Sequence, residues 1–125
     1  MLYSDDSATK LSDQCSLSVE RRVDRLTFGL HGEFDLSCGE TFQQAIAGAI
    51  DDRVTELVVD LRGLSFVDST GLNALLCLRV RAERGGFDFV VLCGEGHVMH
   101  VLTLTGLDEF LPVVNPSAVL PETIT

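Results

Sequence analysis

Two short apolar runs, joined by a stretch of helical periodicity, constrain the fold of this chain more than any other feature. Residues 57–61 and 87–92 are almost wholly apolar, which is typical of strands covered on both faces. Residues 69–84 between them repeat apolar side chains at helical spacing and stop at Gly85-Gly86. Strands connected by a helix of this length run parallel. The sequence therefore predicts an α/β fold with a mixed, mostly parallel sheet and helices packed on it.

The flanking segments extend the sheet toward both ends. Residues 15–19 and 26–34 alternate apolar and polar side chains around Asp24-Arg25, which predicts a β-hairpin. A last short strand is predicted over residues 110–114, at the sheet edge because Pro112 has no backbone N–H to donate.

Two further helices and an N-terminal leader complete the predicted order ββαβαβαβ. Helical spacing predicts helices over residues 38–52 and 97–104. A turn is expected at Gly63, after the first buried strand. Residues 1–14 are polar and aperiodic, so they are predicted to form a flexible leader before a single domain over residues 15–125.

Charge and composition exclude several kinds of partner. The chain of 125 residues carries a formal net charge of −10, which repels nucleic-acid backbones and anionic lipid surfaces. It contains no apolar stretch near the ~20 residues that a membrane span requires, and its first residues lack the features of a signal peptide. We therefore expect a cytoplasmic protein without direct nucleic-acid binding or membrane insertion.

Motifs for catalysis and metal binding are absent from the sequence. It has neither a phosphate-binding Gly-x-x-x-x-Gly-Lys loop nor a Gly-x-Ser-x-Gly nucleophile elbow. The four cysteines form no Cys-x-x-Cys pair, and His97 and His100 lack a third converging ligand. No catalytic residue and no metal are predicted, although a small enzyme that depends on these histidines is kept as an alternative.

Ser69 stands at the start of the predicted helix, within Asp68-Ser69-Thr70-Gly71-Leu72. A serine in this position is usually an N-cap, whose hydroxyl accepts a hydrogen bond from a free backbone N–H. Two neighbours are unusual for a simple cap, because Leu72 replaces the Glu or Gln of a capping box and Gly71 costs about 1 kcal/mol relative to alanine. A glycine is tolerated where another chain approaches the backbone closely. We interpret Ser69 as a cap beside a docking surface.

The helix that follows Ser69 has two apolar stripes. One contains Leu72, Leu76 and Val80, and the other contains Ala74, Leu78 and Ala82 with Leu75 beside them. One stripe must cover the sheet. The other either packs on the third helix or stays exposed as a partner surface, and the sequence leaves both options open.

A phosphate on Ser69 would act on binding more than on folding. It would add about −1.5 to −2 charges at a helix N-terminus, where the dipole favours an anion. A partner closed over Gly71 and Leu72 would have to bury this dianion beside Asp68. Serine phosphorylation is therefore predicted to release a bound partner.

Several ordered motifs in this chain resemble a known family. They are Gly32-Glu33-Phe34-Asp35, the run Leu61-Arg62-Gly63-Leu64-Ser65-Phe66-Val67-Asp68-Ser69-Thr70-Gly71-Leu72, Gly85-Gly86, and Leu104-Thr105-Gly106-Leu107. From residue 15 to residue 114 the chain resembles the STAS domains of bacterial anti-sigma factor antagonists. The resemblance implies the STAS fold. The family usually ends in a helix, whereas Pro116 and Pro121 leave room for only one or two turns here.

The resemblance also implies a function. The unphosphorylated protein would bind an anti-sigma factor with serine kinase activity and so free a sigma factor, and a serine phosphatase would reset the cycle. The phosphorylated residue would be Ser69, with Thr70 as a neighbour and Asp35 close to the loop. Partner binding would involve Asp35, Asp68, Ser69, Thr70, Gly71 and Leu72. ATP would belong to the kinase, so no cofactor is expected.

An alternative keeps the family but removes the switch. STAS domains also serve as subunits of signalling scaffolds and lipid-transport complexes, and in such a subunit Ser69 would only cap its helix.

Overall fold

The computed structural model describes residues 6–116, and a six-stranded sheet runs through them. The strands lie in sequence order: β1 (Asp6–Ser12), β2 (Cys15–Arg22), β3 (Arg25–Phe34), β4 (Glu56–Val67), β5 (Asp88–Leu92) and β6 (Val113–Val114). The pairs β1–β2 and β2–β3 are antiparallel, whereas β3–β4, β4–β5 and β5–β6 are parallel. The predicted α/β fold with a mixed, mostly parallel sheet is confirmed.

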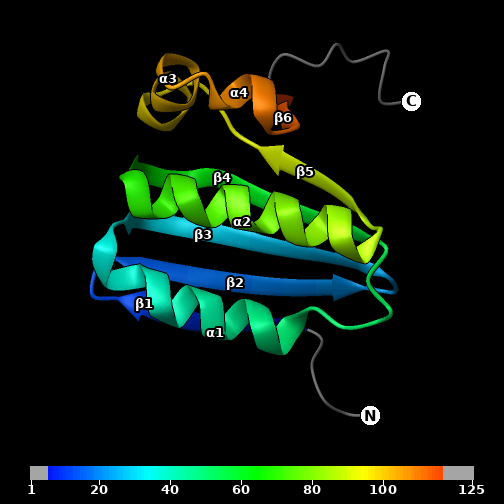
Figure 1. The fold of residues 1–125 in the computed structure, drawn as a ribbon. Coiled ribbons are helices and arrows are strands. Elements are labelled where there is room, and N and C mark those ends of the chain that lie inside the picture. Colours follow the sequence, from blue (N-terminus) through cyan, green and yellow to red (C-terminus); the bar gives the residue numbers. More distant parts are fainter. Residues whose placement is uncertain (1–5, 117–125) are drawn as a thin grey trace.

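The two longest helices cover one face of this sheet. The helical elements are the 3-10 turn η1 (Leu36–Cys38), α1 (Gly39–Ala49), α2 (Ser69–Gly85), α3 (His97–Leu104) and α4 (Leu107–Phe110). Figure 1 shows α1 and α2 side by side across the sheet, with α3 and α4 beyond the end of β5. None of the helices within residues 6–116 is long and apolar enough to cross a membrane.

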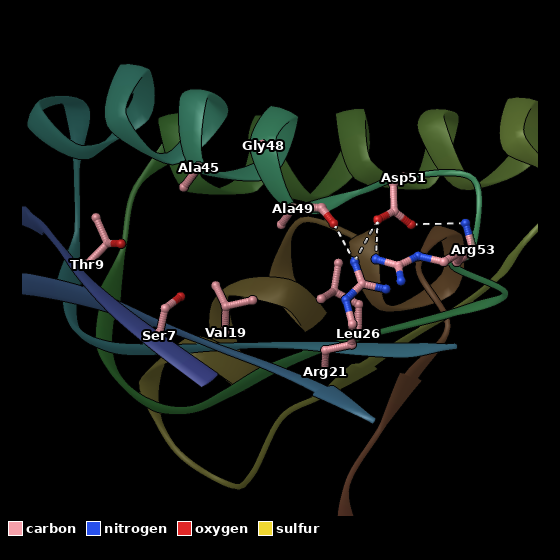
Figure 2. A pocket seen from close by; sticks show the side chains of 10 residues that line it. All are labelled: Ser7, Thr9, Val19, Arg21, Leu26, Ala45, Gly48, Ala49, Asp51 and Arg53. Carbon is pink, nitrogen blue, oxygen red and sulfur yellow. Dashed lines mark hydrogen bonds and ion pairs between the residues drawn. The ribbon is translucent and has the colours of Figure 1, made fainter. Parts of the chain in front are cut away.

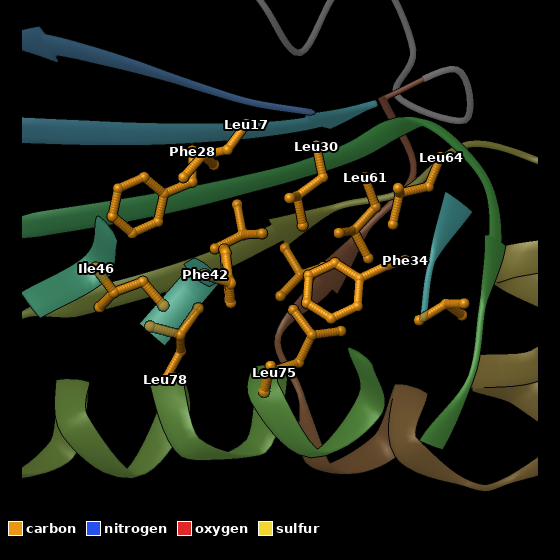
Figure 3. Packing of buried hydrophobic residues seen from close by; sticks show 14 of the residues in the cluster. Leu17, Phe28, Leu30, Phe34, Phe42, Ile46, Leu61, Leu64, Leu75 and Leu78 are labelled. Atoms are coloured by element: carbon orange, nitrogen blue, oxygen red, sulfur yellow. The ribbon is translucent and has the colours of Figure 1, made fainter. Parts of the chain in front are cut away.

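The core lies between the sheet and these two helices (Figure 3). Phe42 of α1 stands edge-on to Phe28 and Phe34 of β3, with ring centroids 6.4 and 5.3 Å away. The inner face of α2 contributes Leu75 and Leu78, both buried. Burying a side chain of this size stabilises the fold by roughly 1.5–3 kcal/mol. The core therefore holds α1 and α2 against β3 and β4, the strands that precede them in the chain.

Arg21 of β2 anchors the C-terminal end of α1 (Figure 2). One of its terminal nitrogens, Nη2, donates to the carbonyl oxygen of Ala49 at 2.8 Å and lies 3.3 Å from the carboxylate of Asp51. This carboxylate also pairs with Arg53. These contacts organise a groove of about 380 Å³ between α1 and the first two strands.

The N-terminal part of the chain differs from the prediction. Residues 1–14 were expected to form a flexible leader, but Asp6–Ser12 forms β1 and pairs with β2. An edge strand is held by backbone hydrogen bonds, so it needs few apolar side chains and gives little periodic signal. Leu11 is its buried side chain, whereas Ser7 and Lys10 are exposed.

Three other boundaries were also placed wrongly. No turn occurs at Gly63, because β4 continues through it; a Cβ there would lie 2.3 Å from Nδ1 of His31 in the neighbouring strand. The first helix is shorter than residues 38–52 and is preceded by a 3-10 turn. The predicted strand over residues 110–114 is reduced to β6, since Phe110 ends α4. The expected C-terminal turns beyond Pro116 lie outside the described residues.

Candidate functional site

Asp35 and Asp68 end two adjacent parallel strands. Phe34 of β3 pairs in register with Val67 of β4, and each aspartate follows directly. The backbone N–H of Asp68 donates to the carbonyl oxygen of Phe34 at 3.2 Å, which ties the two strand ends together. Open α/β sheets place binding sites outside the carboxyl ends of their strands. The register therefore brings both predicted carboxylates to the edge where a site is expected.

The sequence analysis predicted that Ser69 caps α2. This prediction is wrong, because the N-cap residue is Asp68. The backbone of Asp68 is extended, and its Oδ1 accepts hydrogen bonds from the N–H groups of Thr70 at 2.9 Å and Gly71 at 3.3 Å. Aspartate is as good an N-cap as serine, and its charge also interacts favourably with the helix dipole. The cap and the serine are thus separate residues.

Ser69 is consequently the first residue of α2, and its side chain is exposed. Within the described part of the chain, its hydroxyl makes no hydrogen bond. A hydroxyl that has no structural role can react or be modified without loss of a contact. The site therefore presents a free nucleophilic oxygen at the N-terminus of a 17-residue helix.

Gly71 is buried, and the close packing of the protein's core around it explains why this position requires a glycine. A Cβ at this position would lie 2.3 Å from Cγ2 of Val67 and 3.0 Å from Cδ1 of Phe34. The close packing inside the protein therefore accounts for this glycine without a partner, and a partner contact at Gly71 stays a prediction. Thr70 is partly buried, and its methyl group would lie 3.0 Å from a Cβ on Gly39.

Asp35 caps the turn that follows β3. Its Oδ1 accepts hydrogen bonds from the Ser37 hydroxyl at 2.5 Å and from the Ser37 N–H at 2.9 Å. These two hydrogen bonds, of which the one from the hydroxyl has the larger effect, hold the pKa of the Asp35 carboxyl below its usual value. Asp35 therefore stays ionised at neutral pH and adds a fixed negative charge near the cap of α2.

Two exposed apolar side chains at the same edge were missed by the sequence analysis. Leu36 directly follows Asp35 and is 79% exposed, and Phe66 lies two residues before Asp68 and is 39% exposed. The ring of Phe66 stacks on that of His97, with centroids 5.8 Å apart and planes 8° from parallel. The sequence does contain a signal for such a surface, because Leu36 is an apolar residue inside the polar turn Asp35-Leu36-Ser37.

The two stripes of α2 are resolved by their burial. Ala74, Leu78 and Ala82 face the sheet and are buried. Leu72 and Leu76 are only partly buried, and Val80 is 43% exposed. The outer stripe is therefore partly open to solvent.

The profile of the STAS domain family matches residues 16–118. The chain belongs to the STAS domain family. This confirms the resemblance on which the prediction rested, and with it the STAS fold.

Three solved structures resemble this STAS domain. An anti-sigma factor antagonist from Mycobacterium paratuberculosis is 26% identical, with a TM-score of 0.74 over 90% of this chain and 92% of the other. The anti-sigma factor antagonist SpoIIAA in its unphosphorylated form is 23% identical, with a TM-score of 0.67 over 81% and 90%. The Bacillus cell fate determinant SpoIIAA in the phosphorylated form is 22% identical, with a TM-score of 0.62 over 81% and 93%. The last two likenesses concern the fold alone.

Proposed function

We propose that this STAS domain is an anti-sigma factor antagonist that binds an anti-sigma factor with serine kinase activity and is released when Ser69 is phosphorylated. The observation that carries the proposal is the Ser69 hydroxyl, which is exposed and unbonded at the start of α2 while Asp68 caps the helix. The similarity to an antagonist of known structure supports the same role.

The unphosphorylated domain binds its partner through the edge around Ser69. Asp35, Asp68, Thr70 and Leu72 contribute polar and apolar contacts, and the exposed Leu36 and Phe66 extend the apolar part. Gly71 supports this surface from below, because it is buried against Val67 and Phe34. Apolar anchors within a polar rim are the usual composition of a protein interface.

Phosphorylation changes the charge of this edge. The carboxylates of Asp35 and Asp68 supply two negative charges, and a phosphate raises the total to about four. Asp68 already occupies the N–H groups of Thr70 and Gly71, so the phosphate stays in water. A seated partner would have to strip that water from a dianion beside two like charges, which costs several kcal/mol. The modification therefore ends binding and leaves the fold intact.

The chemistry of the switch needs no cofactor in this domain. The Ser69 oxygen attacks the γ-phosphorus of an ATP held by the kinase, the bond to the ADP oxygen breaks and releases ADP, and a base of the kinase takes up the hydroxyl proton. A serine phosphatase hydrolyses the ester and restores the binding form. The domain supplies the acceptor and its position.

The test is phosphorylation by a purified anti-sigma serine kinase of the same organism with ATP. The wild-type domain and a Thr70→Ala control should each gain one phosphate, whereas Ser69→Ala should gain none and keep the wild-type unfolding midpoint. Ser69→Asp should lose affinity for the kinase. Phosphate that persists on Ser69→Ala would refute the acceptor, and unchanged binding of Ser69→Asp would point to a STAS subunit without a switch.

A further inference from the structure

The exposed ring of Phe66 is not alone at the end of β4, because the ring of His97 stacks on it. Their centroids lie 5.8 Å apart, and their planes are 8° from parallel. Phe66 is 39% exposed and His97 is exposed too, so the core fixes neither ring. Stacked aromatic rings attract each other by more than the area they bury. The stack therefore gives Phe66 a fixed orientation in an exposed position.

The stack forms because β4 extends beyond β5. Strand β5 pairs with β4 only as far as Asp60, whereas β4 continues to Val67. The helix α3 begins at His97, shortly after β5 ends. Its second residue, Val98, is buried and lines a small hollow together with Leu64 of β4. Val98 therefore fixes the start of α3 beside the end of β4, where the side chain of His97 reaches the ring of Phe66.

Phe66 belongs to the same edge of the sheet as Ser69. It stands three positions before the serine, so at about 3.3 Å per residue the two lie within roughly 10 Å of each other along the chain. Aromatic side chains are enriched among the residues that dominate the affinity of protein interfaces. A side chain that must be immobilised on binding costs affinity, and this cost falls when the side chain is ordered beforehand.

We propose that His97 is a positioning residue for Phe66 in the interface with the anti-sigma factor kinase. His97 holds the Phe66 ring in the orientation in which the kinase contacts it, so the ring does not have to be ordered when the complex forms. The inference rests on the proposed function and adds the start of α3 to the site. It also gives a role to one of the two histidines on which the enzymatic alternative depended.

The first measurement concerns the free domain and needs no kinase. Nuclear Overhauser effects between the ring protons of Phe66 and His97 should be present in the wild type. His97→Ala should remove the stack and His97→Phe should keep it. His100→Ala is the matched control, because His100 is a second exposed histidine on α3 and takes no part in the stack. All three variants change exposed side chains, so they should keep the wild-type unfolding midpoint.

The second measurement is the affinity for a purified anti-sigma serine kinase of the same organism, by isothermal titration calorimetry. His97→Ala should bind about two- to tenfold more weakly than the wild type, whereas His97→Phe and His100→Ala should bind like it. In the kinase assay, the KM for the domain should rise by the same factor in His97→Ala. The kcat should not change, because the stack does not touch the reacting atoms.

A double-mutant cycle separates positioning from direct contact. Phe66→Ala should weaken binding at least as much as His97→Ala does. In the Phe66→Ala background, His97→Ala should cause no further loss, because His97 acts through the ring that is already missing. A further loss in the double variant would show that His97 contacts the kinase itself, and it would overturn the positioning role.

Two other results would overturn the proposal while the proposed function stands: wild-type binding that neither Phe66→Ala nor His97→Ala weakens, or a free wild-type domain without contact between the two rings. A wild-type domain that binds no kinase would instead refute the proposed function, and with it the role of His97 in binding. The two failures are therefore distinguished by the wild-type titration.

Discussion

Replacement of Gly71 by alanine tests the packing that positions the candidate site. In a helix, alanine is favoured over glycine by up to about 1 kcal/mol. At Gly71, however, the added Cβ would lie 2.3 Å from Cγ2 of Val67 and 3.0 Å from Cδ1 of Phe34. Inserting a methyl group into a packed core costs about 1–3 kcal/mol. We therefore expect Gly71→Ala to lower the free energy of unfolding, by up to about 2 kcal/mol after the helical gain.

A matched control is available in α1. Gly48 is helical and exposed, and a Cβ there would meet nothing within 4 Å. Gly48→Ala should therefore raise the free energy of unfolding by about 0.5–1 kcal/mol through helix propensity alone. The two substitutions are chemically identical, so the difference between them, about 1–3 kcal/mol, isolates the clash at Gly71.

Urea denaturation followed by circular dichroism measures both variants. Val67→Ala removes the methyl group that clashes, so its effect in combination with Gly71→Ala should be smaller than the sum of the single effects by at least about 0.5 kcal/mol. If Gly71→Ala were as stabilising as Gly48→Ala, the close packing of Gly71 against the strand ends would be refuted. Glycine at that position would then require another explanation.

Three further predictions concern the cap, the hairpin and the buried thiols. In thermal unfolding, Asp68→Ala should lose about 1 kcal/mol of stability, whereas Asp68→Asn should keep most of the wild-type stability and Ser69→Ala should change it by less than about 0.5 kcal/mol. A larger loss in Ser69→Ala would show that the serine caps the helix. Val23 has a φ of 58° and is 91% exposed, so Val23→Asn should gain about 1 kcal/mol in urea unfolding, and the β-branched control Val23→Thr should gain nothing. Burial, and secondly the neighbouring Cys38, raises the pKa of the Cys15 thiol from 9.0 to about 12. Because the folded state keeps this proton to a higher pH than the unfolded state, the free energy of unfolding, measured with urea, should fall as the pH rises from about 9 to 12, and it should fall less in Cys15→Ala.

In the proposed switch, the residue that caps α2 and the residue that is phosphorylated are different ones. If the Ser69 hydroxyl held the helix N-terminus, phosphorylation would disturb the fold and the interface together. Asp68 carries the cap instead, and its two hydrogen bonds stay in place whatever happens at Ser69. The proposed switch can therefore act through charge and desolvation at the interface while α2 remains folded.

The fold class and the place of Ser69 at the start of a helix could be predicted from the sequence because they depend on local patterns. Apolar runs without polar interruption mark buried parallel strands, and helical spacing after Ser69 marks the connecting helix. The helix over His97–Leu104 was predicted with the observed bounds for the same reason. The motif around Ser69 also carried the family resemblance, which the STAS profile confirms.

Features that depend on backbone pairing escaped prediction. The edge strand β1 is polar and is held by its ladder with β2. Gly63 was interpreted as a turn because the close approach of His31 from β3 is invisible in the sequence. Gly71 was assigned to a partner for a similar reason, since Val67 and Phe34 reach it only after the strands have aligned.

The sequence by itself determined which side chains could carry the chemistry, namely the serine and the carboxylates of the Asp35 and Asp68 motifs, since residue type and local order are written in the chain. Only the tertiary structure decided their division of labour. The register of β3 with β4 placed the two aspartates together, gave the cap to Asp68 and left the Ser69 hydroxyl free. The pairing of β3 with β4 joins residues far apart in the sequence, and local pattern cannot specify its register.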